Sequence, residues 1–299
     1  MKRYCLYLFI LIGISCSAEL KAQRNGTVYK GNDTAVRYTG RTLVSPDGSV
    51  AFDWVGTYLE TRFTGGKLSM KVSETGTSYY NVFVDGKLHK VVKVCGTDTL
   101  IHLVSGIDKR IHSLKIQKRS EGEFGKTTVH QFVLSGSGRL AEEPAVRTRH
   151  IEFIGNSLTC GYGTDGKHRD EPFLVETENC NLTFASMIAR YYDADYTLIA
   201  HSGRGAARNY GDSVRVSKVT MKDRMLNTFD EDLTHKWNFK GYRPDLVVIN
   251  LGSNDFSTEP HPYKSEFTKA YKQILAQLRE HYGDIPILCI YPVAMQAPV

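Results

Sequence analysis

The sequence predicts an all-β sandwich of jelly-roll type followed by an α/β domain built on a parallel sheet. Three observations predict this: a chain of 299 residues, short alternating segments in the first half, and apolar strands that alternate with amphipathic helices in the second half. Single domains cluster at about 100 to 150 residues, so the length favours two. With 41% hydrophobic and 23% charged residues, the composition is typical of globular proteins.

The first half, predicted as a sandwich over residues 23–140, shows the period of two that is typical of strands. Residues 50–54 and 67–72 alternate between polar and apolar side chains. Turn residues separate such segments, and Asp85-Gly86 between two β-rich runs predicts a hairpin. No long stretch of this half has helical periodicity.

Residues 141–150 read as a linker, after which the pattern changes, and the second domain is predicted over 151–299. Short apolar runs alternate there with segments whose apolar residues recur every three or four positions. This alternation indicates a parallel sheet with helices on both faces. We expect strands at 151–154, 196–200, 245–251 and 286–291, and helices around 184–191 and 267–278.

The first 22 residues are typical of a signal peptide. Lys2 and Arg3 precede an apolar run over 6–14, and Ala22 supplies the small residue at a cleavage site. The run is too short to span a bilayer, so we expect a secreted or periplasmic protein with no stable membrane insertion. A lipoprotein anchored through Cys16 is the alternative.

Charge and cysteine content restrict the partners of the mature chain. The formal charge is +6 and the basic residues are scattered, so no nucleic-acid partner is expected. No spacing of His and Cys suggests a metal, and no cofactor is expected. Beyond the signal peptide lie four cysteines: Cys160 and Cys180 flank one loop and can form a disulfide, Cys289 in an apolar run is expected to be a buried thiol, and Cys95 completes the set.

Polar motifs follow three of the predicted parallel strands, at residues 155–157, 202–203 and 252–255. Ligands of an open parallel sheet bind outside the carboxyl ends of its strands, so the three motifs are expected to converge. A serine hydroxyl there can attack an ester if a base accepts its proton. Ser157 provides the hydroxyl, and its N–H, the Gly203 N–H and the Asn254 amide can stabilise the oxyanion.

Together these motifs resemble the SGNH (GDSL-like) hydrolases, and more narrowly carbohydrate esterase family 2. Residues 155–163, 202–205 and 250–256 are similar to the nucleophile, glycine and asparagine blocks of that family. The resemblance extends into the sandwich at residues 40–41, 52–54, 84–86 and 118–122. It implies a flavodoxin-like, three-layer α/β domain, with Ser157 as nucleophile and Gly203 and Asn254 in the oxyanion hole. Asn156 departs from the commonest block, which has Asp there.

The resemblance also implies a function and a partner. Members remove O-acetyl groups from plant polysaccharides such as xylan and mannan without a cofactor, so the expected partner is an acetylated polysaccharide or oligosaccharide. Two alternatives remain open. One is a carbohydrate-binding or scaffold protein whose hydrolase domain is inactive. The other is a different SGNH lipase or esterase, although the polar loop over 164–181 favours a short acyl group.

Four further residues have both an ordinary and a functional interpretation. Tyr162 lies so near Ser157 in sequence that it can form a wall of the substrate pocket or part of the core. Asp255 can contact substrate, or it can act as an ion-pair or capping residue. Trp54 and Trp237 are expected to pack rather than to bind sugar rings.

No histidine of the sequence occupies the position at which the family carries its general base. The spacing of Asp165 to His168 and of Asp232 to His235 is that of the family's base motif, but the family carries its base after the last strand. Both pairs are therefore expected to be incidental surface residues. The chain as given is predicted to lack its catalytic histidine, and thus to be incomplete at its C-terminus.

Overall fold

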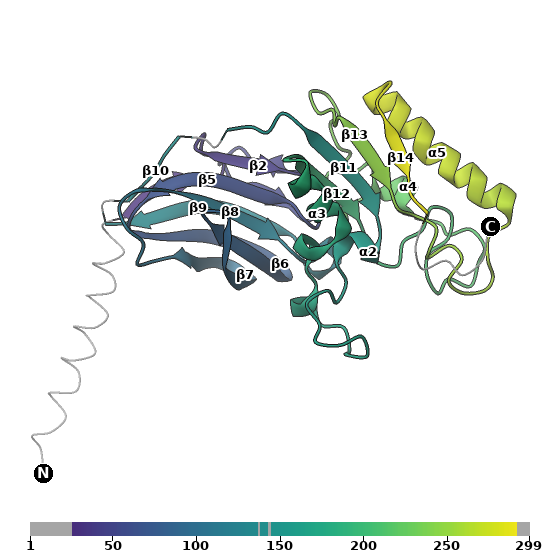
Figure 1. Ribbon diagram of the computed structural model, residues 1–299, viewed down its shortest axis with the longest axis horizontal. Coiled ribbons are helices and arrows are strands. Elements are labelled where there is room, and N and C mark those ends of the chain that lie inside the picture. The colour runs from purple at the N-terminus through teal and green to yellow at the C-terminus, as the bar shows by residue number, and fades with distance from the viewer. Residues whose placement is uncertain (1–25, 137, 143–144, 292–299) are drawn as a thin grey trace, which may run out of the picture.

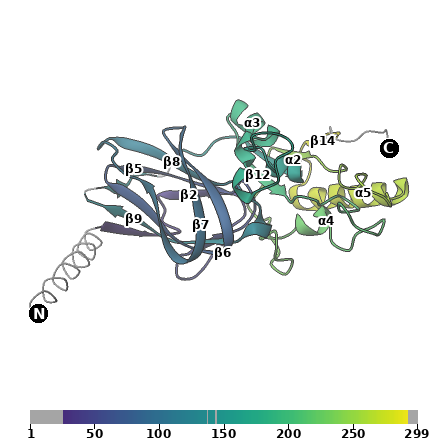
Figure 2. The same ribbon diagram turned by 90° about the horizontal axis from the view of Figure 1, so that it is seen from below.

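The computed structural model describes residues 26–291 except 137, 143 and 144, so the predicted signal peptide lies outside the described residues. An antiparallel sheet forms one end of the molecule, and a parallel sheet with its helices forms the other (Figures 1 and 2). The predicted order of a β domain and an α/β domain is therefore confirmed. Within the described part of the chain, no helix combines the length and apolar character that a membrane crossing requires.

The N-terminal sheet contains ten strands. Its main path runs β10-β5-β8-β6-β9-β4-β3, while β1 pairs with β9, β2 with β5 and β7 with β6. The strands are β1 (Gly26–Lys30), β2 (Val36–Thr39), β3 (Leu43–Val44), β4 (Val50–Phe52), β5 (Tyr58–Thr64), β6 (Lys67–Val84), β7 (Lys87–Val104), β8 (Ile111–Lys118), β9 (Thr127–Ser135) and β10 (Arg139–Leu140).

A long hairpin turns the predicted sandwich into one continuous, curled sheet. Strands β6 and β7 have 18 residues each and are joined at Asp85 and Gly86, whose φ angles of 49° and 75° suit a tight hairpin turn. One edge of β6 pairs with β9 over its first half and with β8 over its second half. Register shifts near Glu74 interrupt the β6–β7 pairing, and such irregularities bend and twist a strand. The sheet therefore closes around a single apolar core, which includes Phe63, Met70 and Phe132.

The C-terminal sheet has four parallel strands: β11 (His150–Gly155), β12 (Asp195–Ala200), β13 (Leu246–Ile249) and β14 (Ile287–Cys289). Their order is β12-β11-β13-β14, which matches the start of the flavodoxin-like order implied by the resemblance. The helices are α2 (Ser157–Cys160), α3 (Phe184–Tyr191), α4 (Met221–Arg224) and α5 (Lys264–Tyr282), and the short 3-10 turns are η1 (Gly122–Phe124), η2 (Val175–Thr177) and η3 (Cys180–Leu182).

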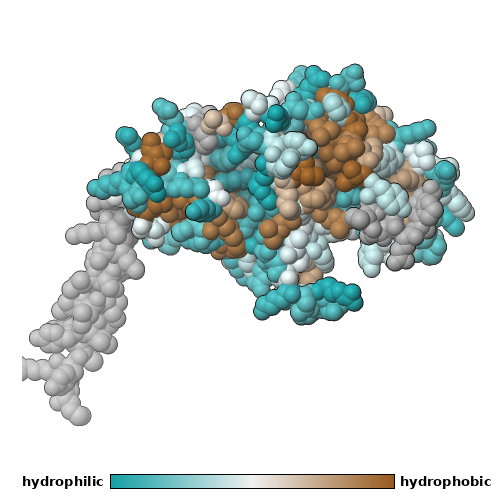
Figure 3. Space-filling model, in the orientation of Figure 1, coloured by the Kyte–Doolittle hydropathy of each residue, from teal (hydrophilic) through white to brown (hydrophobic). Residues whose placement is uncertain are grey.

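The two faces of the parallel sheet are covered unequally. On the face toward α4 and α5, Val247 and Ile249 are completely buried. On the face toward α3, Leu288 of β14 is 51% exposed, and apolar side chains gather on the surface in this region (Figure 3). Cys289 is exposed as well, so its predicted burial was wrong. Among the described strands, β14 pairs with β13 alone and so lies at the edge of the sheet.

The N-terminal sheet packs directly onto the parallel sheet, and we call this contact zone the seam. Trp54 is completely buried in the apolar core beneath α5, and Tyr58 joins the core beneath α3, although both belong to the N-terminal half. Trp237 is half-buried with its ring 6.0 Å from that of Tyr242. Both tryptophans are thus packing residues, as predicted.

Charged side chains are buried in the seam beside this apolar part. The guanidinium of Arg41, which is 1% exposed, donates to the carbonyls of Met225 (2.6 Å) and Asn227 (2.8 Å). It also lies 3.7 Å from the carboxylate of Glu152 on β11. The fixed geometry of these contacts sets how the two sheets are oriented, which apolar contact alone does not.

A second charged group of the seam surrounds Asp195 at the start of β12. Its carboxylate accepts hydrogen bonds from Arg37 (2.7 Å), Arg147 (2.8 Å) and the Tyr58 hydroxyl (2.6 Å). Burial favours the neutral acid, but the hydrogen bonds and charge of Arg37 and the other donors outweigh it and lower the Asp195 pKa to about 2. Asp195 is therefore ionised at neutral pH.

Candidate active site

Ser157 is the first residue of α2, directly beyond the end of β11. The turn is tight, since a Cβ on Gly155 would lie 2.0 Å from Thr159 Oγ1. Asn156 caps the helix by accepting the Leu158 N–H (3.3 Å), and its Nδ2 donates to Ser253 Oγ (2.9 Å). An Asp at position 156 could accept in the same way but could not donate when ionised. Asn156 thus links the nucleophile turn to the asparagine loop.

Gly203 lies in the loop after β12, with a φ of +74° that favours glycine. The loop begins beside β11, because the His201 N–H donates to the Gly155 carbonyl. Among the described residues, neither the Gly203 N–H nor the Ser157 N–H donates a hydrogen bond to another group. Both are therefore available to a substrate oxygen.

Asn254, in the loop after β13, reaches across to the glycine loop. Its Nδ2 donates to the Arg204 carbonyl at 2.8 Å, and the side chain as a whole is 8% exposed. This contact uses one of the two amide hydrogens and leaves the second for another acceptor. Since Asn156 bonds to Ser253 and Asn254 bonds to Arg204, the structure brings the three predicted loops together.

The suggested contact of Asp255 with a substrate is wrong, because the structure buries this residue. Its side chain is completely buried, and its carboxylate accepts the N–H groups of Ala206 (3.0 Å), Ala207 (2.6 Å) and Arg208 (2.9 Å). The close approach also requires Gly205, where a Cβ would lie 2.5 Å from an Asp255 oxygen. Asp255 therefore holds the glycine loop in shape, which is the capping role among its predicted alternatives.

Tyr162 has an exposed face near the nucleophile. Its N–H donates to the Ser157 carbonyl (3.2 Å), its side chain is 48% exposed, and its ring stacks on Phe173 with the centroids 3.7 Å apart. Phe173 in turn lies 5.7 Å from Phe124 of η1, so this aromatic stack joins both halves of the chain. The Tyr162 ring, Phe173 and His168 line a small surface cavity. Tyr162 is thus an exposed residue beside Ser157 and not part of a core.

The two predicted Asp–His pairs have no link to Ser157. Asp165 accepts from Arg119 and Asn179 rather than from His168, which is exposed. His235 is 55% exposed and contacts Asp232 through Nδ1. No histidine ring among the described residues forms a hydrogen bond with the Ser157 hydroxyl.

A buried histidine that the sequence analysis did not single out lies at the end of β12. His201 Nδ1 contacts Asp230 at 2.7 Å, and its Nε2 lies 3.4 Å from Glu123. Burial opposes its charge, but Asp230 and the other nearby carboxylates outweigh this and raise the His201 pKa to about 10. His201 is therefore a fixed cation rather than a base. In the sequence, the position of His201 directly before Ser202-Gly203 is the signal that could have marked it as a residue near the site.

Two groups of described residues bring three potential metal ligands within 4.8 Å of one another: His201, Asp230 and Glu231, and the buried set Glu121, Cys160 and Glu178. The first is held by the His201–Asp230 contact. The second contains Cys160, which is a free, buried thiol, as is Cys180, so the possible disulfide between them is not formed. Burial raises the pKa of the Cys180 thiol to about 12 and also raises that of Cys160, so neither is a thiolate.

The fold and the three loops define a class of protein, the GDSL-like serine hydrolases. Residues 153–299 match the GDSL-like lipase/acylhydrolase family, and residues 38–144 match the family described as carbohydrate esterase 2 N-terminal.

Whole-chain similarities make the assignment more specific. The structure of a family two carbohydrate esterase from Clostridium thermocellum in complex with cellohexaose is 34% identical, with a TM-score of 0.81, and the match covers 86% of this chain and 77% of that one. The chain belongs to carbohydrate esterase family 2.

Two curated relatives are similar over most of this chain. The cellulase/esterase CelE of Acetivibrio thermocellus is 34% identical over 258 residues, which are 86% of this chain and 31% of that protein. An acetylxylan esterase/glucomannan deacetylase of Cellvibrio japonicus is 33% identical over 226 residues, 73% of this chain and 61% of that protein. The matched region thus spans less than two thirds of the length of either relative.

Proposed function

We propose that this chain is a serine esterase that removes O-acetyl groups from plant polysaccharides of the xylan and mannan type. One observation carries the proposal: Ser157 lies in a cluster of three cross-linked loops that also holds the Gly203 N–H and the Asn254 amide. A hydroxyl beside several free donors suits acyl transfer, in which negative charge develops on the carbonyl oxygen.

The reaction proceeds in two halves. A general base takes the Ser157 proton while Oγ bonds to the acetyl carbon, and the carbonyl oxygen becomes an oxyanion that accepts from Ser157 N–H, Gly203 N–H and Asn254 Nδ2. Collapse of this intermediate breaks the bond to the sugar oxygen, which receives the proton. Water then attacks the acetyl-serine by the same route, releasing acetate and restoring the hydroxyl.

Both the aromatic stack and the names of the relatives support a sugar substrate. The exposed face of Tyr162, backed by Phe173, offers a flat apolar surface on which a sugar ring can pack. The similar protein of Cellvibrio japonicus is named an acetylxylan esterase/glucomannan deacetylase. The polar surroundings of Tyr162, which include Arg169 and Glu171, fit an acetylated sugar better than a long acyl chain.

A second candidate function is glycan binding at the same site without turnover. The similar structure from Clostridium thermocellum was determined in complex with cellohexaose, and this name indicates a sugar chain without acetyl groups. Under this alternative, the hydrolase domain is an inactive carbohydrate-binding module. The stacked rings of Tyr162 and Phe173 would then provide the apolar surface on which the bound sugar chain packs.

Because no histidine among the described residues bonds to Ser157, the test uses the full-length gene product. It compares wild type with Ser157→Ala on acetylated xylan and acetylated glucomannan. We expect acetate release from the wild type and none above background from the variant, while cellohexaose binding measured by calorimetry is retained. Equal acetate release from both proteins would overturn the proposal. Binding of cellohexaose with no acetate release from the wild type would select the glycan-binding alternative.

Export and domain division form part of the same proposal. Residues 1–22 would be removed as a signal peptide, giving a secreted or periplasmic protein made of a domain over 23–140, a linker over 141–150 and a hydrolase domain over 151–299. Mass spectrometry of the mature N-terminus distinguishes cleavage after Ala22 from a lipid-modified Cys16. An intact Met1 on protein in the cytoplasm would contradict export.

A further inference from the structure

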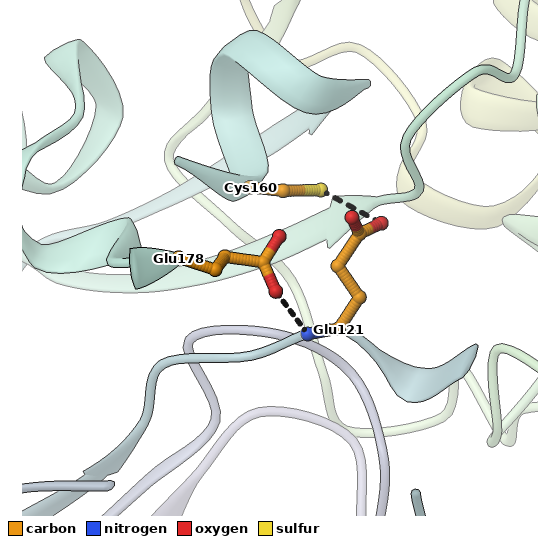
Figure 4. A group of neighbouring side chains, drawn as sticks. All are labelled: Glu121, Cys160 and Glu178. Carbon is orange, nitrogen blue, oxygen red and sulfur yellow. Dashed lines mark hydrogen bonds between the residues drawn. The ribbon is translucent and has the colours of Figure 1, made fainter. Parts of the chain in front are cut away.

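Two glutamates from different halves of the chain meet beneath the candidate active site (Figure 4). Glu121 follows β8 of the N-terminal sheet, Glu178 follows η2 in the C-terminal half, and both are completely buried. One oxygen of each carboxylate and the sulfur of Cys160 lie within 4.8 Å of one another. Two ionised carboxylates this close, away from water, would repel strongly.

The hydrogen bonds around the pair leave one oxygen of each carboxylate unaccounted for. Glu178 Oε2 accepts the Glu121 N–H at 2.9 Å, while Glu121 Oε2 accepts both the Ser202 N–H and the Cys160 thiol (3.3 Å). The remaining Oε1 atoms are buried and have no partner in the described part of the chain. The partnered oxygen of Glu121 thus contacts both the loop after β12 and helix α2.

The two carboxylates differ in their donors. Glu121 Oε2 receives two donors from the C-terminal half of the chain, whereas Glu178 Oε2 receives one from the Glu121 backbone. Burial, the nearby Glu121 carboxylate and a hydrogen bond with that side chain raise the Glu178 pKa well above its ordinary value.

We propose that Glu121 is a positioning residue whose carboxylate sets the oxyanion loop against the nucleophile helix. The Ser202 N–H belongs to the residue directly before Gly203, and Cys160 lies on α2 three positions after Ser157. One carboxylate of the N-terminal sheet therefore fixes two elements of the site relative to each other. The proposal rests on the proposed esterase function and gives the N-terminal sheet a part in it.

Cationic side chains contact the backbone beside the two glutamates. Lys118 Nζ donates to the Ser120 (3.0 Å) and Glu121 (3.1 Å) carbonyls, and Arg119 Nε donates to the Glu178 carbonyl (2.7 Å). His201, held by Asp230, supplies another cation, and the charge of Glu121 contributes to its raised pKa. The other acidic groups that act on the pair or its neighbours are Asp230, Glu123 and the neutral thiols of Cys160 and Cys180.

The experiment compares Glu121→Gln with Glu178→Gln, using Glu74→Gln as a matched control. Glu178→Gln leaves both contacts of Glu121 Oε2 in place, whereas Glu121→Gln puts a neutral amide where the carboxylate accepts the Ser202 N–H and the Cys160 thiol. Glu74 is also a buried glutamate of the N-terminal sheet, but its oxygen accepts from Thr127 and touches neither loop. All variants are assayed for acetate release, thermal unfolding and the amide proton shift of Ser202.

We expect Glu121→Gln to lower kcat by about 10- to 100-fold with KM within about threefold, since small displacements of reacting groups cost this much. The loss of kcat in Glu178→Gln should be about tenfold smaller than the loss in Glu121→Gln. Glu74→Gln should change the unfolding temperature but not kcat. The Ser202 amide proton should move upfield in Glu121→Gln only. Equal losses of kcat in the two variants, or an unchanged Ser202 shift in Glu121→Gln, would overturn the proposal.

The Ser202 amide shift does not depend on catalysis. It therefore still decides the positioning claim if Ser157→Ala shows that the proposed esterase function is wrong.

Discussion

The core of the N-terminal sheet and the seam are both buried, but they are built from opposite kinds of side chain. Phe63, Met70 and Phe132 in the core are completely buried and apolar. In the seam, the ionisable side chains of Arg41 and Glu121 are just as inaccessible. Apolar burial stabilises in proportion to area and tolerates small shifts, whereas a hydrogen-bonded charge requires fixed geometry.

The difference indicates what the seam contributes. Buried ion pairs are weak sources of net stability, because desolvation offsets most of their attraction, but removal of one partner is costly. Charges in the seam thus add little stability that apolar residues could not supply. They do fix the orientation of the parallel sheet and its loops, on which the spacing of Ser157, Gly203 and Asn254 depends.

The largest effect is expected at the site that the seam supports. Asn254→Ala removes one oxyanion donor and should lower kcat by about 10²- to 10³-fold, with a smaller change in KM. Steady-state acetate release measures this. Asn238→Ala, an exposed asparagine in a loop, serves as control and should match wild type. A loss confined to KM would assign Asn254 to ground-state sugar binding instead.

A pair of stability variants separates the core from the seam. Met70→Ala should destabilise by about 2 to 5 kcal/mol through a cavity, and Arg41→Met by about 3 to 5 kcal/mol because Glu152 and two carbonyls lose their partner. Urea unfolding gives these values. At a temperature where both variants are folded, only Arg41→Met should also lower kcat. A similar kcat for both variants would remove the distinction between the two regions.

Acid titration tests the Asp195 group of the seam. The folded pKa of about 2 lies below the ordinary 3.8, so ionised Asp195 stabilises the fold above about pH 4, and this stabilisation is lost as the pH falls toward 2. Asp195→Asn should cost roughly 2 kcal/mol at pH 7. The difference from wild type should shrink below pH 3. A difference in stability between wild type and Asp195→Asn that stays constant from pH 7 to below pH 3 would mean that the charge of Asp195 does not cause the difference.

The smallest effect is expected at two histidines outside both regions. His168→Ala and His235→Ala should leave kcat within about twofold of wild type, since neither ring contacts Ser157 and both are exposed. Acetate release across pH 5 to 9 checks this. A large loss in either variant, with loss of the acidic limb of the profile, where a histidine base is protonated, would identify that histidine as the base.

Sequence patterns captured the features that depend on neighbouring residues. The hairpin at Asp85-Gly86 follows from local turn chemistry, and the convergence of the three loops follows from the geometry of any parallel sheet. The fold class was therefore predictable, as was the packing of Trp54. The continuous curling of the N-terminal sheet was not, because it depends on one strand pairing with two partners.

The contacts of the seam were beyond the reach of sequence patterns because they join distant residues. Arg41 and Met225 are 184 positions apart, and Glu121 and Ser202 are 81 apart. A charged residue whose partner is so remote looks like an ordinary surface residue in the sequence. Asp255 shows the same limit, since its capping role depends on the path of the loop over Ala206 and Ala207.

The most direct test of the central claim is covalent labelling of the nucleophile. An aryl phosphonate reacts with an activated serine when Oγ bonds to phosphorus and the aryl oxide leaves, so peptide mass spectrometry can locate the modified residue. We predict one phosphonyl group on the peptide that contains Ser157, lost in Ser157→Ala and slowed in Asn254→Ala. A label on another residue, or an unlabelled Ser157 in a preparation that still releases acetate, would contradict the account.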